Sequence, residues 1–471
     1  MQPVLTPAES ARLDAAAAGR IDDLMDRAGY AVAIAATEMG VGYGARVAVL
    51  AGKGSNGGDG YVAARYLRRR GAAVRVHALT PPRAGSAAER ALRAARAEGV
   101  RVLPWTTKPG PADLVIDALF GVGFEGALPA EVEPWLDHDA PVLAVDVPSG
   151  LDAATGTVAG SAFTAARCVT FHSLKPGHVL RQGPEWCGTV TVADIGLEGG
   201  EPVLRVCEAS DAPRPGRPRT AHKWSAGSVV VVGGSPGMTG APLLAAEAAL
   251  RSGAGAVTLM CPAGLQPIYA ARAPGLLTRG IGKGVRFAPG DVDEVLAAGG
   301  RFDVMVLGPG VGLDSGGFAT QLVLRWPGRL LVDADGLNDL DGIGAISARQ
   351  AAAILTPHAG EFARLTGQQA GHDTAADVAA AIRKVVLLKG NPTFVMGRER
   401  WLVRSGGPEL ATIGTGDVLA GFIAALWARG LEAEVAARSG AYWHGVAGAA
   451  LATAGTVTAP DLAETVGRHA W

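Results

Sequence analysis

Cysteine is scarce in this chain, and the four cysteines lie far apart in the sequence. None of them belongs to a Cys-x-x-Cys pair, so the chain lacks both the ligand spacing of a structural zinc site and the clustering of a disulfide framework. The N-terminus also lacks the basic segment and apolar core of a secretory signal peptide. We therefore expect a cytoplasmic protein whose cysteines are reduced.

The chain also lacks an excess of charge of either sign and any long apolar run. Lys and Arg number 43 against 44 Asp and Glu, which gives a formal net charge of −1. This balance argues against a nucleic acid or an anionic membrane as a partner. No uninterrupted apolar run approaches the ~20 residues that a membrane span needs. We expect small-molecule substrates, no nucleic acid and no membrane.

Aromatic residues are few as well, at 5% of 471 residues, whereas Gly, Ala and Val are abundant. Small residues let helices lie close to a sheet, as they do in layered α/β folds. The length exceeds one ordinary hydrophobic core and predicts two domains. Residues 209–221 are rich in Pro and Arg and lack hydrophobic periodicity. We expect them to form an exposed linker between domains at 1–208 and 222–471.

Short apolar runs alternate with helical stretches in both halves, which predicts mostly parallel sheets with helices on both faces. In the first half the expected strands are 46–51, 74–79, 114–118, 142–147, 168–171 and 189–193. In the second half they are 228–232, 256–260, 304–307, 330–333, 353–356, 385–389 and 401–404. Ligands of open α/β sheets bind beyond the carboxyl ends of the strands, so polar residues at those ends are the site candidates.

A glycine-rich loop follows the first expected strand and opens a helix. Gly52, Gly54 and Gly57 fit the G-x-G-x-x-G pattern, but no acidic residue ends the next strand to hold an adenosine ribose. Asp59 in the same loop would repel a pyrophosphate. These departures exclude ordinary NAD(P) redox binding and favour a polar ligand together with a cation.

Three further strands of the first half end in polar residues. Asp117 and Asp146 each stand next to a glycine turn, and His172 and Lys175 follow another strand. Either aspartate alone would be explained as a turn or cap residue. Because the residues would meet at one edge of the sheet, together they predict a site.

In the second half, Gly-Thr-Gly-Asp at 414–417 opens an apolar helical stretch. Free backbone N–H groups at a helix N-terminus suit a phosphoryl group, and Asp417 would take the proton of an attacking hydroxyl. Taken alone, Asp417 would serve equally well as a simple helix cap. A cap does not require Gly on both sides of Thr415 or the loops at His358 and Lys389, so we favour a site. The loop at 233–240 lacks the Gly-Lys-Ser/Thr ending of a P-loop, which excludes a Walker-type NTPase.

Motifs throughout the first half resemble the epimerase domain of the NAD(P)H-hydrate repair enzymes: LMDRAG, SNGGDG, DALFGVGF, AVDVPSGLD and TFHSLKPG. The resemblance implies a Rossmann-like αβα sandwich and a potassium ion held by Asn56, Asp117 and Ser149. It implies substrate contacts at Ser55, Asn56, Gly57, Gly58, Asp59, Gly121, Val122, Gly123, Phe124, Glu125, Gly126, Ala127 and Asp146. Asp59 or Asp146 would act as acid or base, and the sequence leaves both open. Ser55 stands where the family usually has Asn, which leaves that contact open too.

Residues 222–471 resemble the dehydratase domain of the same repair system, which has a ribokinase-like α/β fold. The motifs are GGSPGMTGAP, LGPGVG, DADGLN, TPHAGEFARL, LKGNPT and GTGDVLAG. The resemblance implies Asp417 as the catalytic base and hydrate contacts at Ala241, Gly312, His358 and Asp417. It implies nucleotide contacts at Lys389, Gly390, Asn391, Pro392, Thr393 and Gly416. His358 fits an ordinary hydrogen-bonding role equally well.

Together the two resemblances imply repair of hydrated NADH and NADPH (NADHX and NADPHX). The first domain would interconvert the R and S epimers. The second would dehydrate the S form with ADP (or ATP) and Mg²⁺, giving AMP (or ADP) and phosphate. We expect a homo-oligomer. Two alternatives remain: a vitamin-precursor kinase, whose product would be a stable phosphate ester, and a first domain that serves as a protein-binding scaffold.

Overall fold

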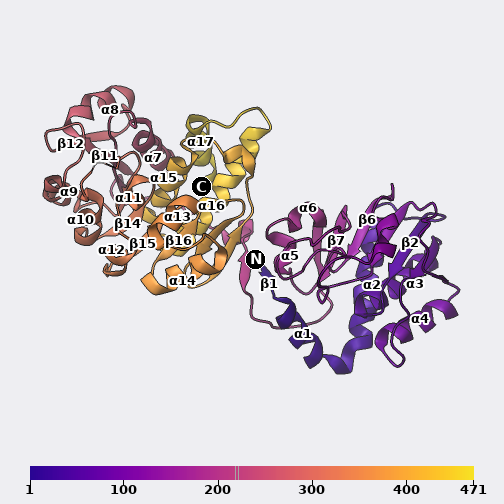
Figure 1. Cartoon of the computed structure of the whole chain (residues 1–471). Helices are drawn as coiled ribbons and strands as arrows, with labels where there is room; N and C mark the ends of the chain where they lie inside the picture. The colour runs from indigo at the N-terminus through magenta and orange to yellow at the C-terminus, as the bar shows by residue number, and fades with distance from the viewer. Residues whose placement is uncertain (218, 221, 314) are drawn as a thin grey trace. The chain divides into compact units, whose positions relative to one another are not determined.

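The computed structural model divides the chain into two compact units (Figure 1). It describes residues 1–217, 219–220, 222–313 and 315–471. The N-terminal unit is Gln2–Val203, and the C-terminal unit is Leu204–Trp471 together with Met1. None of the helices described is long and apolar enough to cross a membrane.

The N-terminal unit is built on a parallel sheet with the strand order β4-β3-β2-β5-β6-β7-β8. Its strands are β2 (Arg46–Ala51), β3 (Ala73–Ala78), β4 (Arg101–Pro104), β5 (Leu114–Ala118), β6 (Val142–Val145), β7 (Arg167–Phe171) and β8 (Thr189–Ala193), and β1 (Gln2–Val4) precedes them. Its helices are α1 (Pro7–Ala16), α2 (Ile21–Glu38), α3 (Ser55–Arg69), α4 (Ala87–Ala97), α5 (Pro176–Val179) and α6 (Gly183–Cys187).

Alternating residues of β2 explain why this sheet is covered on both faces. Val47 and Val49 join an apolar cluster with α2, α3 and α4, whereas Ala48 and Leu50 pack on the opposite side with Trp135. A strand buried on both faces reads as a continuous apolar run, which is the pattern that predicted it. The Rossmann-like layering expected from the sequence is confirmed.

The C-terminal unit has a larger mixed sheet with the strand order β9-β18-β17-β16-β15-β14-β13-β10-β11-β12. The strands are β9 (Leu204–Val206), β10 (Ser228–Val232), β11 (Ala256–Pro262), β12 (Leu277–Ile281), β13 (Val304–Leu307), β14 (Arg329–Val332), β15 (Ala353–Leu355), β16 (Val385–Leu388), β17 (Thr393–Met396) and β18 (Arg400–Val403). The neighbouring strands in the run β16-β15-β14-β13-β10-β11-β12 are parallel, and β17 is antiparallel to both of its neighbours, β16 and β18. Its helices are α7 (Gly240–Arg251), α8 (Gln266–Arg272), α9 (Val292–Gly299), α10 (Phe318–Arg325), α11 (Asp335–Asn338), α12 (Gly344–Ser347), α13 (Ala359–Thr366), α14 (His372–Ile382), α15 (Thr415–Ala428), α16 (Ala433–Ala452) and α17 (Ala459–Val466).

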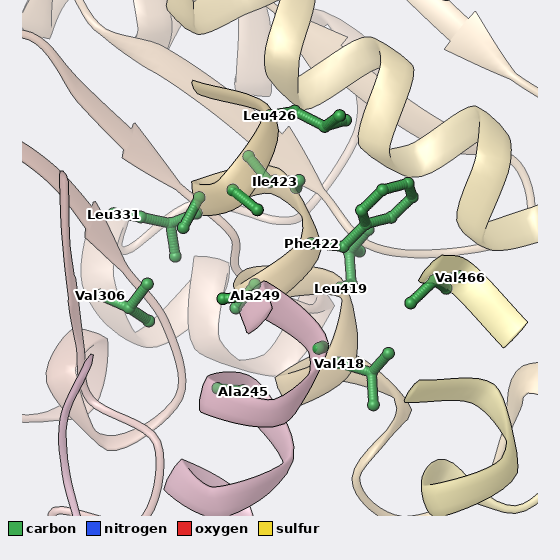
Figure 2. Packing of buried hydrophobic residues seen from close by; sticks show 14 of the residues in the cluster. Ala245, Ala249, Val306, Leu331, Val418, Leu419, Phe422, Ile423, Leu426 and Val466 are labelled. Carbon is green, nitrogen blue, oxygen red and sulfur yellow. The ribbon is translucent and has the colours of Figure 1, made fainter. Parts of the chain in front are cut away.

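Helix α15 lies in the core of this unit and packs against α7 (Figure 2). It is apolar around its whole circumference, as expected of a helix without a solvent-facing side. The contact is close because Gly421 has no side chain: a Cβ there would lie 1.9 Å from the carbonyl oxygen of Ala245. The residues at the start of α15 are therefore held by a rigid, buried helix.

Most described residues of the segment expected as a linker at 209–221 are exposed, as predicted, but the segment belongs to the C-terminal unit. The units divide after Val203, because β9 pairs with β18 in the C-terminal sheet. Trp443 donates its indole N–H to the carbonyl of Ala212 at 2.8 Å, and the Arg214 guanidinium lies 4.3 Å from the Trp443 ring centre. The segment before residue 218 thus packs on the C-terminal unit. Pro218 and Ala221, which also belong to the predicted linker, lie outside the described residues.

Candidate active sites

A cavity of about 650 Å³ lies at the carboxyl ends of the strands in the N-terminal unit. Its walls come from the residues after β2, β5, β6 and β7, and from α1. The predicted site residues in its lining are Ser55, Asn56, Asp59, Gly121, Val122, Gly123, Phe124, Glu125, Ala127 and Asp146. Gly57, Gly58 and Gly126 lie outside the lining, and Asp117 and Ser149 are buried behind it.

The glycines of the first loop allow the backbone segments around the cavity to touch. A Cβ at Gly57 would lie 2.0 Å from the carbonyl oxygen of Gly52, and one at Gly52 would lie 1.9 Å from that of Leu119. A Cβ at Gly58 would collide with the Met25 side chain at 2.5 Å. Gly57 and Gly58 therefore face the protein, against Gly52 and Met25, and Gly52 brings the loop before α3 against Leu119, just after β5.

The three predicted metal ligands lie in one buried cluster. The Asp117 carboxylate accepts hydrogen bonds from the backbone N–H and the hydroxyl of Ser149, both at 2.7 Å, and from the Leu119 N–H at 3.3 Å. The Asn56 amide donates to the carbonyls of Phe120 and Val145, both at 2.9 Å. Burial raises the pKa of Asp117 to about 6, although its hydrogen bonds oppose that shift.

This cluster offers only oxygen ligands: carboxylate, hydroxyl, amide and backbone carbonyl. One formal negative charge and neutral oxygens suit a large, hard monovalent cation better than a metal that prefers thiolate or imidazole ligands. No group of three or more His, Cys, Asp or Glu side chains that could hold a metal occurs in the part of the chain that the structure describes. The residues present fit a cation such as potassium.

Asp59 and Asp146 share the cavity but have opposite electrostatic surroundings. Burial raises the pKa of Asp59 well above its usual range, and the nearby carboxylates of Asp146 and Asp14 add to the effect. Burial alone would also raise the pKa of Asp146, but Lys175 and the Thr170 hydroxyl outweigh it and lower that pKa. One carboxyl favours its neutral form and the other its ionised form, which are the states of a general acid and a general base.

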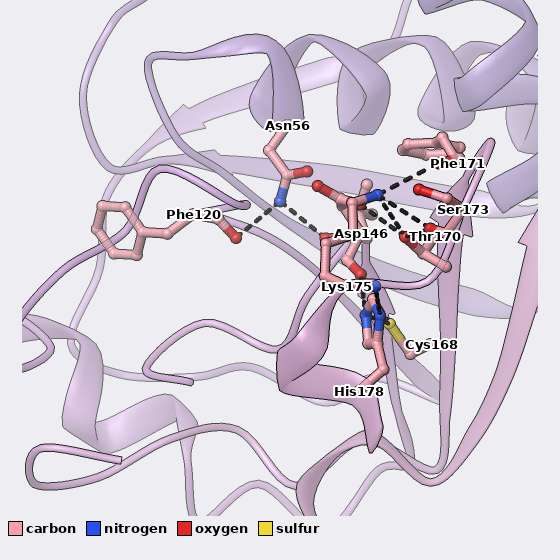
Figure 3. A network of polar contacts seen from close by, with 10 residues as sticks. Asn56, Phe120, Asp146, Cys168, Thr170, Phe171, Ser173, Lys175 and His178 are labelled. Atoms are coloured by element: carbon pink, nitrogen blue, oxygen red, sulfur yellow. Dashed lines mark hydrogen bonds and ion pairs between the residues drawn. The ribbon is translucent and has the colours of Figure 1, made fainter. Parts of the chain in front are cut away.

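Sequence reasoning assigned no role to two residues of this cavity. Lys175 is 3% exposed, and its ammonium lies 2.8 Å from Asp146 Oδ1 (Figure 3). Asp14 reaches the cavity from α1, which carries none of the recognised motifs. Lys175 stood out in the sequence only as a polar residue after a strand, and no local pattern pointed to Asp14.

In the C-terminal unit, the first turn of α15 is held from several directions. Gly414 starts the helix with φ 90°, a conformation that favours glycine. The Thr415 hydroxyl donates to the carbonyls of Leu410 and Thr412, at 2.8 and 2.9 Å. His444 Nε2 lies 3.0 Å from the carbonyl of Thr415. Burial lowers the pKa of His444 to about 4, so the ring is neutral and donates this hydrogen bond.

Asp417 lies among charged groups that come from the residues just after β14 and β16 and from α13. Lys389 Nζ is 2.7 Å from Asp333 Oδ1 and 3.8 Å from Glu361 Oε2. A Cβ at Gly416 would lie 3.4 Å from the same ammonium, so Lys389 reaches the first turn of α15. Burial, and then repulsion from Asp333, raise the pKa of Asp417 to about 7, while Lys389 opposes the shift. Sequence reasoning gave no role to Asp333 or Glu361.

His358 caps helix α13. Its Nδ1 accepts hydrogen bonds from the N–H groups of Gly360 and Glu361, at 3.0 and 3.3 Å, and its side chain is more than half exposed. A backbone bridge places it beside Lys389. These contacts fit the ordinary hydrogen-bonding role that the sequence left open for His358. The exposed ring could also contact a ligand.

The other predicted contacts of this unit fall into two places. Gly312 donates its N–H to Asp335 Oδ2 at 3.0 Å and lies against the loop that leads into α7, where Ala241 stands in the first turn. Asp335 also adds to the electrostatic repulsion at Asp417, which links the two places. Lys389, Gly390, Asn391 and Pro392 connect β16 to β17, and Thr393 is the first residue of β17.

Comparisons with known proteins agree with this division. Residues 229–468 match the family model described as NAD(P)H-hydrate dehydratase, and residues 21–177 match the one described as YjeF-related protein N-terminus. The bifunctional NAD(P)H-hydrate repair enzyme Nnr of Moorella thermoacetica is 37% identical over 86% of this chain and 82% of its own length. That of Mycobacterium tuberculosis is 38% identical over 84% and 81%.

A solved structure supports the fold of the C-terminal unit. The crystal structure of a ribokinase-like superfamily protein from Enterococcus faecalis aligns with a TM-score of 0.50 and 23% identity. The alignment covers 57% of this chain and 95% of the other. The ribokinase-like α/β fold expected from the sequence is confirmed.

Proposed function

This chain belongs to the bifunctional NAD(P)H-hydrate repair enzymes, and from that premise we propose which residues perform each of its two activities. It is an NAD(P)H-hydrate epimerase and a nucleotide-dependent NAD(P)H-hydrate dehydratase. Because the relatives match across both halves, neither a vitamin-precursor kinase nor a scaffold describes the chain. Hydration of the nicotinamide ring yields R and S epimers at C6, and a dehydratase that acts on one epimer needs an epimerase to supply it.

We assign dehydration of the S epimer to the first turn of α15. The oxygen of the C6 hydroxyl attacks the terminal phosphorus of ADP or ATP, and Asp417 takes the proton of that hydroxyl. The N–H groups of this turn and the nearby Lys389 ammonium stabilise the charge on the transferring phosphoryl group. This transfer gives AMP from ADP, or ADP from ATP, and a phosphate ester at C6. Phosphate then leaves C6 while the proton at C5 passes to water, which restores the reduced ring.

Magnesium is expected to accompany the nucleotide in the C-terminal unit. Mg²⁺ usually binds through one or two carboxylates, the substrate phosphates and water rather than through an all-protein cage. The available oxygen ligands are the carboxylates of Asp333 and Glu361 beside Lys389 and that of Asp335 near Asp417. When bound, the ion would neutralise charge on the phosphates. His358 and the residues from Lys389 to Thr393 would contact substrate and nucleotide.

Epimerisation is assigned to the cavity of the N-terminal unit, and the opposite pKa shifts of its two carboxyl groups carry this assignment. Neutral Asp59 donates a proton to the C6 hydroxyl, which leaves as water while the ring nitrogen supplies electrons to C6. Water adds to the other face of C6 and gives its proton to ionised Asp146. Potassium held by Asn56, Asp117 and Ser149 would fix the loops that line the cavity.

The test is recovery of reduced nicotinamide from hydrate of mixed epimers, with Mg²⁺, K⁺ and either ADP or ATP. The intact protein should recover all of it and release inorganic phosphate. Asp146→Asn should recover only the S fraction, and Asp417→Asn should recover none while still interconverting the epimers. Asp461→Asn, an acidic residue in the first turn of α17, is the matched control and should behave as wild type. A stable phosphate ester without recovered reduced nicotinamide would contradict the proposal.

A further inference from the structure

Lys175 holds one oxygen of the Asp146 carboxylate. Its Nζ lies 2.8 Å from Asp146 Oδ1, 2.8 Å from Thr170 Oγ1, and 3.2 and 3.3 Å from the carbonyls of Phe171 and Ser173 (Figure 3). The Thr170 hydroxyl also lies 2.8 Å from Asp146 Oδ1 and donates to it. An ammonium has three hydrogens to donate, and these protein acceptors suffice to engage all of them. Lys175 therefore has no donor left over for a substrate.

The second oxygen of the same carboxylate points elsewhere. A Cβ at Gly121 would lie 3.4 Å from Asp146 Oδ2, and Gly121 lines the cavity. The absence of a side chain at Gly121 thus leaves room in front of this oxygen. Lys175 and Thr170 secure Oδ1, and Oδ2 faces the place where a substrate would lie.

His178 holds the backbone of both members of the ion pair. Its Nδ1 accepts a hydrogen bond from the Lys175 N–H at 2.9 Å, so the ring hydrogen is on Nε2, which donates to the Asp146 carbonyl at 2.8 Å. Asp146 has φ 65°, in the left-handed region that is unfavourable for a residue with a side chain. His178 is fully buried, so this clamp is shielded from water.

We propose that Lys175 is a positioning residue for epimerisation, which with Thr170 fixes Asp146 Oδ1 and leaves Oδ2 as the atom that receives the proton. As the water oxygen forms its bond to C6, its O–H bond breaks and the proton moves to Oδ2. In the reverse direction Oδ2 returns that proton. This inference rests on the proposed role of Asp146 as the base of the epimerase.

The experiment compares Lys175→Met with Asp146→Asn and with the double variant in the full-length protein. Epimer interconversion is followed by chromatography without nucleotide and at saturating K⁺. Lys175→Met should lower kcat by about 10²- to 10³-fold with little change in KM, since a misplaced base affects the proton transfer. Because both residues act as one unit, the double variant should be within about threefold of Asp146→Asn. Dehydration of pure S epimer by the same protein should be unchanged, which shows that the C-terminal unit is intact. Thermal unfolding reports whether the N-terminal unit is folded.

Thr170→Val gives a second test that keeps the lysine. It removes one hydrogen bond to Oδ1 and should lower kcat by about 10-fold, as the loss of one bond to a charged group predicts. Thr191→Val is its matched control, because it removes a hydroxyl from the neighbouring strand β8 outside the 650 Å³ cavity. This control should keep wild-type kcat.

The outcomes separate the inference from the proposed function. If Asp146→Asn is inactive while Lys175→Met and Thr170→Val keep wild-type kcat, Lys175 has no positioning role. If Asp146→Asn itself keeps epimerase activity, the proposed base is wrong. Should Lys175→Met unfold the N-terminal unit, Thr170→Val decides: lower kcat at an unchanged melting temperature supports the inference, and unchanged kcat overturns it.

Discussion

At the scale of single residues, burial and neighbouring charge decide which aspartates can act as bases. Asp417 has a pKa of about 7 because it is buried and because Asp333 repels its charge. Asp146 has a lowered pKa because Lys175 outweighs its burial. The same residue type is therefore suited to different protonation states within one chain.

The Asp417 environment predicts a pH dependence for dehydration. A base works when ionised, so kcat/KM for the S epimer should rise with pH through about 7 and level off above it. Lys389 lowers this pKa, and Lys389→Met should therefore move the rising limb to higher pH. Initial rates at constant ionic strength measure both profiles. A profile that stays flat through neutral pH in both proteins would show that Asp417 is not the base.

Potassium dependence is the second prediction at this scale. Asp117→Ala removes the only formal charge among Asn56, Asp117 and Ser149, so it should weaken cation binding and slow epimerisation. Replacing K⁺ by Li⁺ should slow the wild-type enzyme as well, because a smaller ion does not satisfy the same oxygens. Epimer interconversion without nucleotide is the measurement, and Asp152→Asn, on the same loop, is the control. Equal rates in K⁺ and Li⁺ with a fully active Asp117→Ala protein would contradict a potassium site.

At the scale of elements, the contact between α7 and α15 fixes where the second site lies. The carbonyl of Ala245 occupies the space that a side chain at residue 421 would need. Any side chain there would push α15 away from α7. Because α15 begins at Thr415, this displacement would reach Gly416 and Asp417.

Gly421→Ala should destabilise the C-terminal unit by about 1–3 kcal/mol, the usual cost of overpacking a core. It should also lower dehydratase activity while sparing the epimerase. Gly240→Ala is the matched control, because a Cβ at Gly240 meets nothing within 4 Å. Thermal unfolding of the full-length variants measures the difference. Equal melting temperatures for Gly421→Ala and Gly240→Ala would show that the two helices separate without cost.

At the scale of the whole molecule, each unit has its own sheet and its own site. The division after Val203 leaves β9 and the segment that follows it with the C-terminal unit. Within that unit, Arg217 donates to the carbonyl of Gly253 at 2.8 Å and lies over the Trp471 ring. Where the chain is cut should therefore matter.

Fragments 1–203 and 204–471 should both be soluble and should carry epimerase and dehydratase activity respectively. A fragment that starts at residue 218 should be less stable, because it lacks β9, Ala212 and Arg214. Activity assays and thermal unfolding of the three fragments make the comparison. If the fragment from residue 218 were as stable as that from 204, the packed segment would contribute nothing. If neither long fragment were active alone, the two units would depend on each other.

The sequence by itself determined the fold class, the family and the loops that carry the proposed sites. These features are local: an apolar run forms a strand, and the polar residues just after it lie at the carboxyl edge of a parallel sheet. Short strands with polar positions, such as β4 with its exposed Arg101, gave no comparable signal. The residues proposed for each site otherwise remain predictions that the experiments above address.

Only the tertiary structure decided which groups meet. Asp146 and Lys175 are 29 residues apart, and Asp333 and Lys389 are 56 apart, so no sequence window contains either pair. The opposite pKa shifts of Asp59 and Asp146 arise from burial and from charges in other segments, such as Lys175 after β7, and α1 adds Asp14 from outside every motif. The tertiary structure also decided where the C-terminal unit begins. Its boundary lies before β9 because β9 pairs with β18, although the Pro- and Arg-rich composition of the next segment predicted a linker there. Sequence patterns reflect which residues are neighbours along the chain, whereas ion pairs, burial and strand pairing depend on which residues are neighbours in space.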